Sequence, residues 1–407
     1  MGRFTAHLDS DEFATLARHP DHPNAFTRHR KLPLPTLIAV MVSGMRQSVQ
    51  SELDRFFSHL SNQVGLDRFV DAQAFANARK RMAPRALEAL NHWLIAQADP
   101  HLPRWQGLRV VAADGTDMRF GLRASNVDSA AKSNQRGFGL YLPGAELMLA
   151  ASLHSVLESE QQILFQYLDL LSSSDLLILD RGFPCRWLVR VLTQRNIPFC
   201  IRVDKCAFVA VSKFMRSDLP EATVTLPSAD AKDAASYACD TAPTSVRLVR
   251  NIAPNGKMSV VMTNLVDQFA FPAKAFGDLY HQRWRIEEAF KRLKHRLNLE
   301  HVTGLSQTAV CQDFTAKVLC DNLQGLISLA AIAKYLPKNK HVNRAYAHTV
   351  LKPVIPRLLL ALRDAKTLLN RAVRLIATNL QTCKSGLSKP RKPDRVKPHK
   401  YMSQKPC

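Results

Sequence analysis

The stretch YHQRWRIEEAFKRLKH, residues 280–295, places two adjacent glutamates inside a run of arginine, lysine and histidine. A helix turns by about 100° per residue, so spacing shows which side chains share a face. One stripe contains Tyr280, Arg283, Glu287, Lys291 and Lys294. The adjacent stripe is apolar and is expected to face a core; it contains Ile286, Ala289, Phe290, Leu293 and Leu297.

Glu287 is therefore expected at the margin of a core, with cations one turn away on either side, while Glu288 points elsewhere. Ion pairs between residues four apart on a solvated helix face would explain such acids without any function. The helix alone does not distinguish a functional acid from a surface ion pair. The other acids of the chain are needed to distinguish them.

Two aspartates stand where short apolar runs end. Asp114 closes the run in LRVVAADGT, and Asp180 closes the run in LLILDRGF. Runs of this length bounded by turn residues suit buried strands, and FCIRV from Phe199 is a third. WLVRVLTQRN between the last two predicts a helix, hence a βαβ unit. Side chains at the carboxyl ends of parallel strands converge on ligand sites, although a lone aspartate there is more often a turn residue.

Three carboxylates from two strands and a helix would form an oxygen-only site, which suits Mg²⁺ or Mn²⁺. Two such ions about 3.5–4 Å apart clamp the attacking and leaving oxygens of a phosphodiester. The cations beside Glu287, Lys291 among them, would then hold DNA phosphates. This arrangement would explain acids within a basic run.

The composition favours a polyanionic partner. Lys and Arg number 56 against 34 Asp and Glu, a net charge of +22. Such a charge favours nucleic acid first and an anionic membrane surface second, and the mixed charge of the 280–295 helix argues against the membrane. The eight cysteines form no CxxC pair, the N-terminus has no signal-peptide pattern, and no apolar run is long enough to span a bilayer. We expect a cytoplasmic protein with reduced thiols.

The chain is expected to be α/β, flanked by helical regions. Residues 1–104 predict a helical N-terminal domain, which would bind DNA if the basic helix pair described below does so, and residues 105–310 predict a domain that contains the three acids and a β-rich insertion at about 206–265. Residues 311–383 predict a helical C-terminal region and residues 384–407 a basic disordered tail.

A helix pair in the N-terminal region could bind DNA. Asp71 is expected to cap its first helix and Pro84 to lie in the first turn of its second. Basic residues gather at the joint, and a solvated edge of a helical bundle explains them equally well; they are Arg79, Lys80, Arg81 and Arg85.

The spacing Y-(2)-R-(3)-E-(6)-K, formed by Tyr280, Arg283, Glu287 and Lys294, resembles the signature of the insertion-sequence-four transposases, a branch of the DDE class. DGT at Asp114 and DRGF at Asp180 resemble the strand motifs of the family's two aspartates. FTRHRKLPLPTLIAV near the N-terminus and DFTAKVLCDNL after the signature also resemble the family.

The resemblance implies an RNase H-like catalytic core in which Asp114, Asp180 and Glu287 bind two divalent ions. It implies that Tyr280, Arg283 and Lys294 contact DNA near the cleaved end, and that the N-terminal domain recognises terminal inverted repeats. The expected reaction is cut-and-paste transposition: cleavage of double-stranded transposon ends, then strand transfer into target DNA within a synaptic homodimer. The expected place is the bacterial cytoplasm, at the nucleoid.

Two alternatives stay open from the sequence. A metal-dependent nuclease of the same fold would need the same acids without synapsis, and a catalytically inactive copy would bind DNA as a repressor. Other enzyme classes lack their motifs, because the chain has no GxxxxGK[ST], HExxH or GxSxG.

Overall fold

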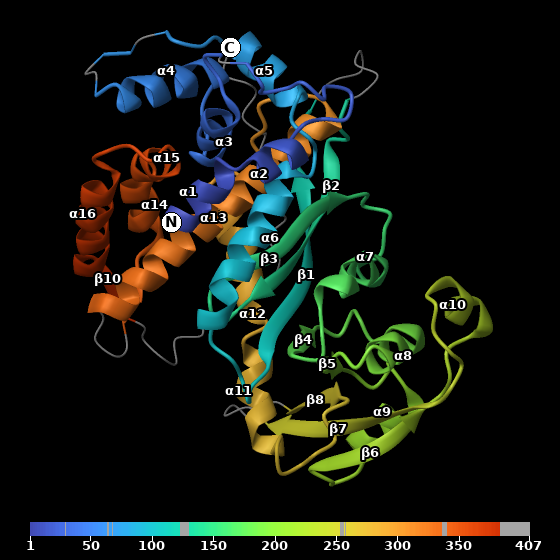
Figure 1. Cartoon of the computed structure of the whole chain (residues 1–407). Helices are drawn as coiled ribbons and strands as arrows, with labels where there is room; N and C mark the ends of the chain where they lie inside the picture. The colour runs from blue at the N-terminus through green and yellow to red at the C-terminus, as the bar shows by residue number, and fades with distance from the viewer. Residues whose placement is uncertain are drawn as a thin grey trace. The chain divides into compact units, whose positions relative to one another are not determined.

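The structure is a computed structural model that describes residues 1–382 apart from 29, 63, 64, 67, 123–129, 253–255, 257 and 336–339. The chain divides into two compact units that interleave along the sequence (Figure 1). We name them the helical unit (residues 1–98, 118–135 and 291–407) and the sheet unit (residues 99–117 and 136–290). The domain boundaries expected at 104 and 310 remain predictions.

The sheet unit is built on an eight-stranded sheet in the order β3-β2-β1-β4-β5-β8-β7-β6. The three apolar runs of the sequence form its parallel centre, with Val111 opposite Leu177 and Ile178 opposite Cys200. All five residues of β4 are buried, as expected for a strand covered on both faces. The strands are β1 (Arg109–Arg119), β2 (Asn134–Leu142), β3 (Leu147–His154), β4 (Asp175–Leu179), β5 (Phe199–Val203), β6 (Glu221–Leu226), β7 (Thr244–Ile252) and β8 (Met258–Thr263).

Helices cover both faces of this sheet. On β2, Phe138 stacks on Tyr167 of α7 (Glu160–Tyr167), with ring centroids 5.9 Å apart. The next residue, Gly139, lies against Phe290 of α12 (Trp284–Arg296), because a Cβ there would be 3.1 Å from the ring. Successive residues of a strand face opposite ways, so α7 and the start of α12 lie on opposite faces. The fold is α/β, and its mixed sheet with β1, β4 and β5 parallel at the centre accords with the RNase H-like core expected from the sequence.

The segment expected to be β-rich contains strands and helices. Its strands β6, β7 and β8 continue the main sheet, since β8 pairs antiparallel with β5. Its helices are α9 (Val209–Arg216) and α10 (Ala231–Ser236), and α8 (Arg186–Gln194) precedes it as the expected crossover helix.

The signature stretch is not one continuous helix, and that expectation was wrong. A 3₁₀ turn (Ala273–Ala275) leads into α11 (Phe276–His281), and α12 begins only at Trp284. Around the break the backbone N–H groups bond to carbonyls three residues back, as from Arg283 to Tyr280 at 3.1 Å. These tighter bonds end α11 and rotate the residues that follow.

The apolar stripe of α12 is confirmed. Ile286 and Ala289 are fully buried, and the other expected members are at most 3% exposed. Glu287 is partly exposed and Glu288 fully so, as their positions on the helix predict.

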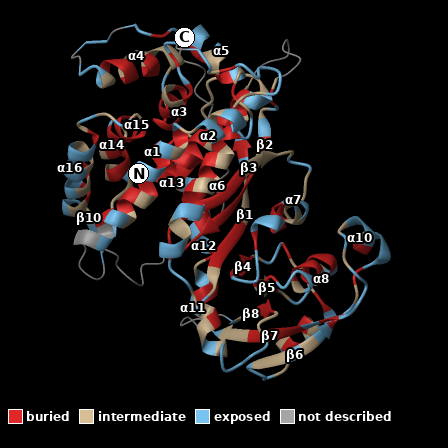
Figure 2. Cartoon of the chain, in the orientation of Figure 1, coloured by how far each residue is buried: buried red, intermediate tan, exposed pale blue. Residues whose placement is uncertain are grey.

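The helical unit gathers around α13 (Gln307–Tyr335), which packs against α3, α6, α14 and α16. Figure 2 shows the buried residues of α13 and the exposed outer face of α16. The expected helical regions are confirmed; their helices are α1 (Gly2–Leu8), α2 (Asp11–Leu16), α3 (Leu34–Val42), α4 (Val49–Leu60), α5 (Ala72–Lys80), α6 (Ala86–Ala98), α14 (Arg344–Leu351), α15 (Val354–Leu359) and α16 (Ala365–Thr378).

Within the part of the chain that the structure describes, no helix is both long and apolar enough to cross a membrane. The tail expected to be disordered, residues 384–407, lies outside the described residues.

Candidate active site

The sheet unit holds all three expected acids. Asp114 lies on β1, two residues beyond the last one that pairs with β4, because the strand continues past the aspartate to Arg119. Asp180 follows directly after β4, and Glu287 lies in the first turn of α12. The acids therefore come from two neighbouring parallel strands and a helix, as the sequence predicted.

Arg283 joins two of these acids. Its Nη1 lies 3.5 Å from Oδ2 of Asp114, and its Nη2 donates a hydrogen bond to Oε1 of Glu287 at 2.8 Å. The Arg283 side chain is only 4% exposed, and its Nε has no hydrogen-bond partner among the described residues. The guanidinium also lies 4.7 Å from the Trp284 ring centroid. The DNA contact expected of Arg283 remains a prediction, and in this structure the side chain faces acids rather than solvent.

The acids shift the protonation of Asp114. Burial raises the pKa of Asp114 from 3.8 to about 7, the Arg283 guanidinium opposes this rise, and the carboxylates of Glu160, Asp180 and Glu287 add to it. Burial is the largest cause, because it disfavours the charged form of the carboxyl group. The three neighbouring carboxylates repel the charged form as well, so a bound cation would favour ionisation of Asp114.

Glu160 is an acid at this edge of the sheet that the sequence analysis missed. A Cβ on Gly115, the residue after Asp114, would lie 2.2 Å from Oε1 of Glu160, so only glycine leaves room for this carboxylate. The next residue, Gln161, donates a hydrogen bond to the carbonyl of Gly182 at 2.6 Å. The first turn of α7 is thus attached to the segments that follow both aspartates.

The surroundings of Glu160 resemble those of Asp114. Burial raises the pKa of Glu160; the Arg136 guanidinium lowers it, and the Asp180 and Asp117 carboxylates raise it further. The available sequence signal was the capping box of Ser159 and Gln162, which marks a helix start. An acid in a first turn is usually explained by the helix dipole, so the signal did not identify a site residue.

The other residues expected to contact DNA have separate surroundings. Tyr280 is 8% exposed, and burial raises the pKa of its hydroxyl to about 12, so it is neutral at physiological pH. In the helical unit, Lys291 is exposed and Nζ of Lys294 lies 3.9 Å from Oε1 of Glu300. Their expected DNA contacts stay predictions.

The oxygen-only acids fit a divalent cation by chemistry. In the described ranges, however, no three His, Cys, Asp or Glu side chains are grouped closely enough to hold a metal ion as they stand. Arg283 supplies the positive charge between Asp114 and Glu287 instead. Asp114 and Glu160 are partly buried carboxylates with further carboxylates nearby, and a bound cation would reduce their repulsion, which supports the fit.

The expected DNA-binding helix pair needs a correction. Asp71 caps α5 as predicted, but α6 begins at Ala86, so Pro84 lies before its first turn. Arg79 is 4% exposed and bonds to Gln312 at 3.0 Å and to Asp313 at 2.8 Å on α13. A buried arginine with acid and amide partners is structural and is not available to phosphate.

A family model described as the transposase DDE domain matches residues 105–323, more than half of the chain. The chain therefore belongs to this family of DDE transposases. It is similar to the transposase InsG for insertion sequence element IS4 of Escherichia coli (strain K12), with 25% identity over 293 residues. The match covers 68% of this chain and 65% of InsG, so it spans less than two thirds of the curated relative.

A similar solved structure is the piggyBac transposase synaptic complex with hairpin DNA, determined by cryo-EM. Its sequence is 11% identical, the match covers 93% of this chain and 84% of that chain, and the TM-score is 0.44. The family implies use of divalent metal.

Proposed function

We propose that this protein is a transposase that binds the terminal inverted repeats of an insertion sequence, cleaves the DNA there and joins the freed ends to target DNA. The observation that carries the proposal is the bridge of Arg283 between Asp114 on β1 and Glu287 on α12. An ordinary surface ion pair would not bring acids from a strand and a helix together on one buried guanidinium.

The three acids would hold Mg²⁺ or Mn²⁺, two ions per site in our proposal. When bound, such ions stabilise the attacking and leaving oxygens of a phosphodiester and favour ionisation of the attacking hydroxyl. Asp114, Asp180 and Glu287 would orient them, and Glu160 would add negative charge behind Asp114. Arg283 would keep Asp114 and Glu287 at a fixed separation and reduce their mutual repulsion.

Three further residues of the stretch 280–295 would contact the DNA. Lys291 and Lys294 would hold backbone phosphates, and neutral Tyr280 would donate a hydrogen bond near the cleaved end. We propose that two copies of the chain act together in a synaptic dimer, since joining two ends requires both to be held. The place of action would be the nucleoid in a bacterial cytoplasm.

The test is a cleavage and strand-transfer assay. Purified full chain would be incubated with Mg²⁺ and labelled DNA carrying the inverted repeats that flank its gene, beside the Asp114→Ala variant. Cleavage at the repeat boundary together with joined products, both lost in the variant, would support the proposal. Cleavage without joined products would indicate the nuclease instead, and specific binding without cleavage would indicate a repressor.

A further inference from the structure

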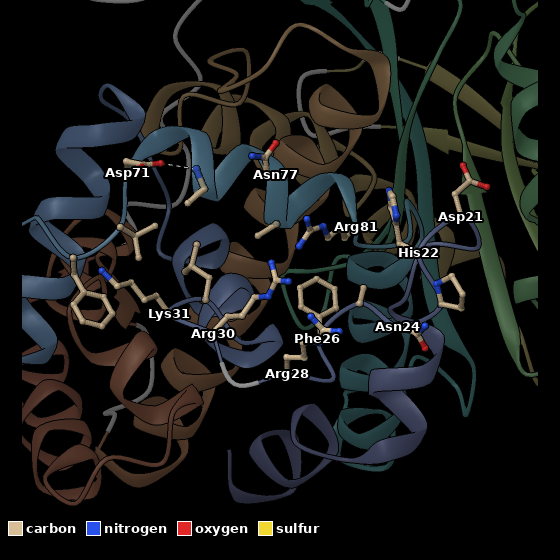
Figure 3. A pocket seen from close by; sticks show the side chains of 17 residues that line it. Asp21, His22, Asn24, Phe26, Arg28, Arg30, Lys31, Asp71, Asn77 and Arg81 are labelled. Atoms are coloured by element: carbon tan, nitrogen blue, oxygen red, sulfur yellow. Dashed lines mark hydrogen bonds between the residues drawn. The ribbon is translucent and has the colours of Figure 1, made fainter.

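A cavity of about 670 Å³ lies in the helical unit, between the segment around residues 21–32 and helix α5 (Figure 3). Its volume is within the range of pockets that hold small molecules or single units of a polymer. The side chains that line it include cations, aromatic rings and amides. Those used in the argument are Phe26, Arg28, Arg30, Lys31, Phe69 and Arg81.

Cations outnumber acids in the lining of the cavity. Among the described residues, Arg28, Arg30, Lys31 and Arg81 form no ion pair with an acid. Two lining residues are acids: Asp71 caps α5 by accepting from Ala74 N at 2.6 Å, and Asp21 lies 3.6 Å from His19, a residue that does not line the cavity. Several guanidinium groups around one space are suited to a phosphate, which they bind in bidentate fashion.

Two phenylalanine rings accompany these cations. Phe26 has a φ of 63°, an unusual backbone conformation for a bulky residue, and its ring lies in the cavity with the Arg30 and Arg81 side chains turned toward it (Figure 3). Phe69 is 47% exposed, and Nζ of Lys31 lies 5.2 Å from its ring centroid. Accessible aromatic faces beside cations are the pattern that stacks unpaired bases.

A phosphate and a flat ring together describe a nucleotide. In a paired duplex the base faces are covered by their neighbours, so the phenylalanine rings would have no ligand there. We propose that this cavity binds one unpaired nucleotide of the DNA, with its phosphate among Arg28, Arg30 and Arg81 and its base against Phe26. The proposal rests on the proposed function only in taking DNA as the substrate.

Binding of two labelled probes by the full chain tests the proposal: fluorescein-labelled oligothymidylate and a blunt duplex of the same length. Phe26→Gly removes the ring and suits the positive φ, so the fold is expected to persist. It should weaken binding of the single strand roughly tenfold and change duplex binding less than about twofold. Phe69→Ala should act in the same direction. Phe269→Ala is the matched control, because Phe269 is 99% exposed and does not line the cavity.

Arg30→Gln should weaken both probes and reduce the dependence of the single-strand affinity on salt by about one unit of slope. The proposal is overturned if both phenylalanine variants bind the single strand as wild type does, if they lose both probes equally, or if Phe269→Ala has the same effect. These outcomes are separate from the cleavage assay. A protein that never cuts repeat ends but discriminates the probes through Phe26 would refute the proposed function alone.

Discussion

Two arginines are buried to the same extent in the two units, and their surroundings differ. In the helical unit, Arg79 bonds through Nε to Gln312, through Nη1 to Thr303 and through Nη2 to Asp313. In the sheet unit, Arg283 pairs with Asp114 and Glu287, and its Nε has no partner among the described residues.

The difference teaches how to distinguish a structural buried charge from a functional one. Around Arg79 the donors and acceptors balance, and Asp313 also accepts from the backbone N–H of Thr303 at 2.6 Å. Around Arg283 the site is less balanced, since burial and the neighbouring carboxylates raise the pKa of Asp114 to about 7 although the Arg283 guanidinium lowers it. A satisfied network stabilises the fold, whereas an unbalanced one retains charge for a ligand.

The largest effect is expected at the acid partner of Arg283. Glu287→Gln keeps the shape of the side chain and removes its charge, so cleavage should fall at least about a thousandfold, or about 4 kcal/mol of transition-state stabilisation. The free energy of unfolding should change less than in a variant that leaves a buried arginine with no acid, because Asp114 stays 3.5 Å from Arg283. An assay of repeat-end cleavage measures the effect on the reaction, and urea unfolding measures the effect on stability. Glu288→Gln, on the exposed neighbour, is the control; equal losses in both variants would refute the assigned helix face.

The acid partner of Arg79 should behave in the opposite way. Asp313→Asn leaves the Arg79 charge buried without its counterion and should lower the unfolding free energy by about 3–5 kcal/mol. Urea unfolding measures this change. The surface pair of Asp169 and Arg195, 2.6 Å apart with the Asp169 side chain 86% exposed, offers the contrast. Asp169→Asn should cost less than about 1 kcal/mol. A buried loss as small as the surface loss would contradict the structural role.

The dependence of stability on pH tests His348, a buried residue of the helical unit with an unsatisfied hydrogen-bonding atom. His348 bonds to Gln324 at 3.0 Å, but its Nε2 has no partner in the described residues. Burial lowers the pKa of His348 from 6.5 to about 4, with Arg46 and Lys352 acting in the same direction and Asp321 opposing.

The direction of the change in stability with pH follows from proton uptake by His348. Between pH 6.5 and 4 the unfolded chain binds the His348 proton and the folded protein does not, so stability falls as the pH falls through this window. In His348→Gln, up to about 3 kcal/mol of this loss of stability at low pH should disappear. Urea unfolding of both proteins across the window measures it. Parallel curves for the two proteins would show that the histidine is not buried as described.

The smallest effect is expected at Glu160. Glu160→Gln removes the charge behind Asp114 and should weaken Mn²⁺ binding about tenfold, or about 1.4 kcal/mol. The rise of the melting temperature with added Mn²⁺ reads this out without activity. Gly115→Ala, which displaces the same carboxylate, should have a similar effect, and Glu158→Gln is the neighbouring control. Wild-type Mn²⁺ dependence in both Glu160→Gln and Gly115→Ala would exclude Glu160 from the site.

Local patterns predicted much of the fold. The apolar runs before Asp114 and Asp180 identified two strands, and the apolar stripe of α12 placed Glu287 at the core's margin. The break between α11 and α12 was not predicted, because nothing in the local sequence forbids a continuous helix at Arg283.

Contacts distant in sequence could not be predicted. Arg79 meets α13, more than 200 residues away, so a cation at a helix joint was interpreted as a possible DNA contact. Glu160 reaches the site only because Gly115 lacks a Cβ, which no spacing rule reveals.

We expect Arg283 to serve the reaction and Arg79 to stabilise the fold. The most direct measurement compares Arg283→Met with Arg79→Met in urea unfolding and in repeat-end cleavage per folded molecule. Arg79→Met should lose several kcal/mol of stability and retain cleavage, and Arg283→Met should lose cleavage with the smaller change in stability. Wild-type cleavage by Arg283→Met, or undiminished stability of Arg79→Met, would contradict the claim.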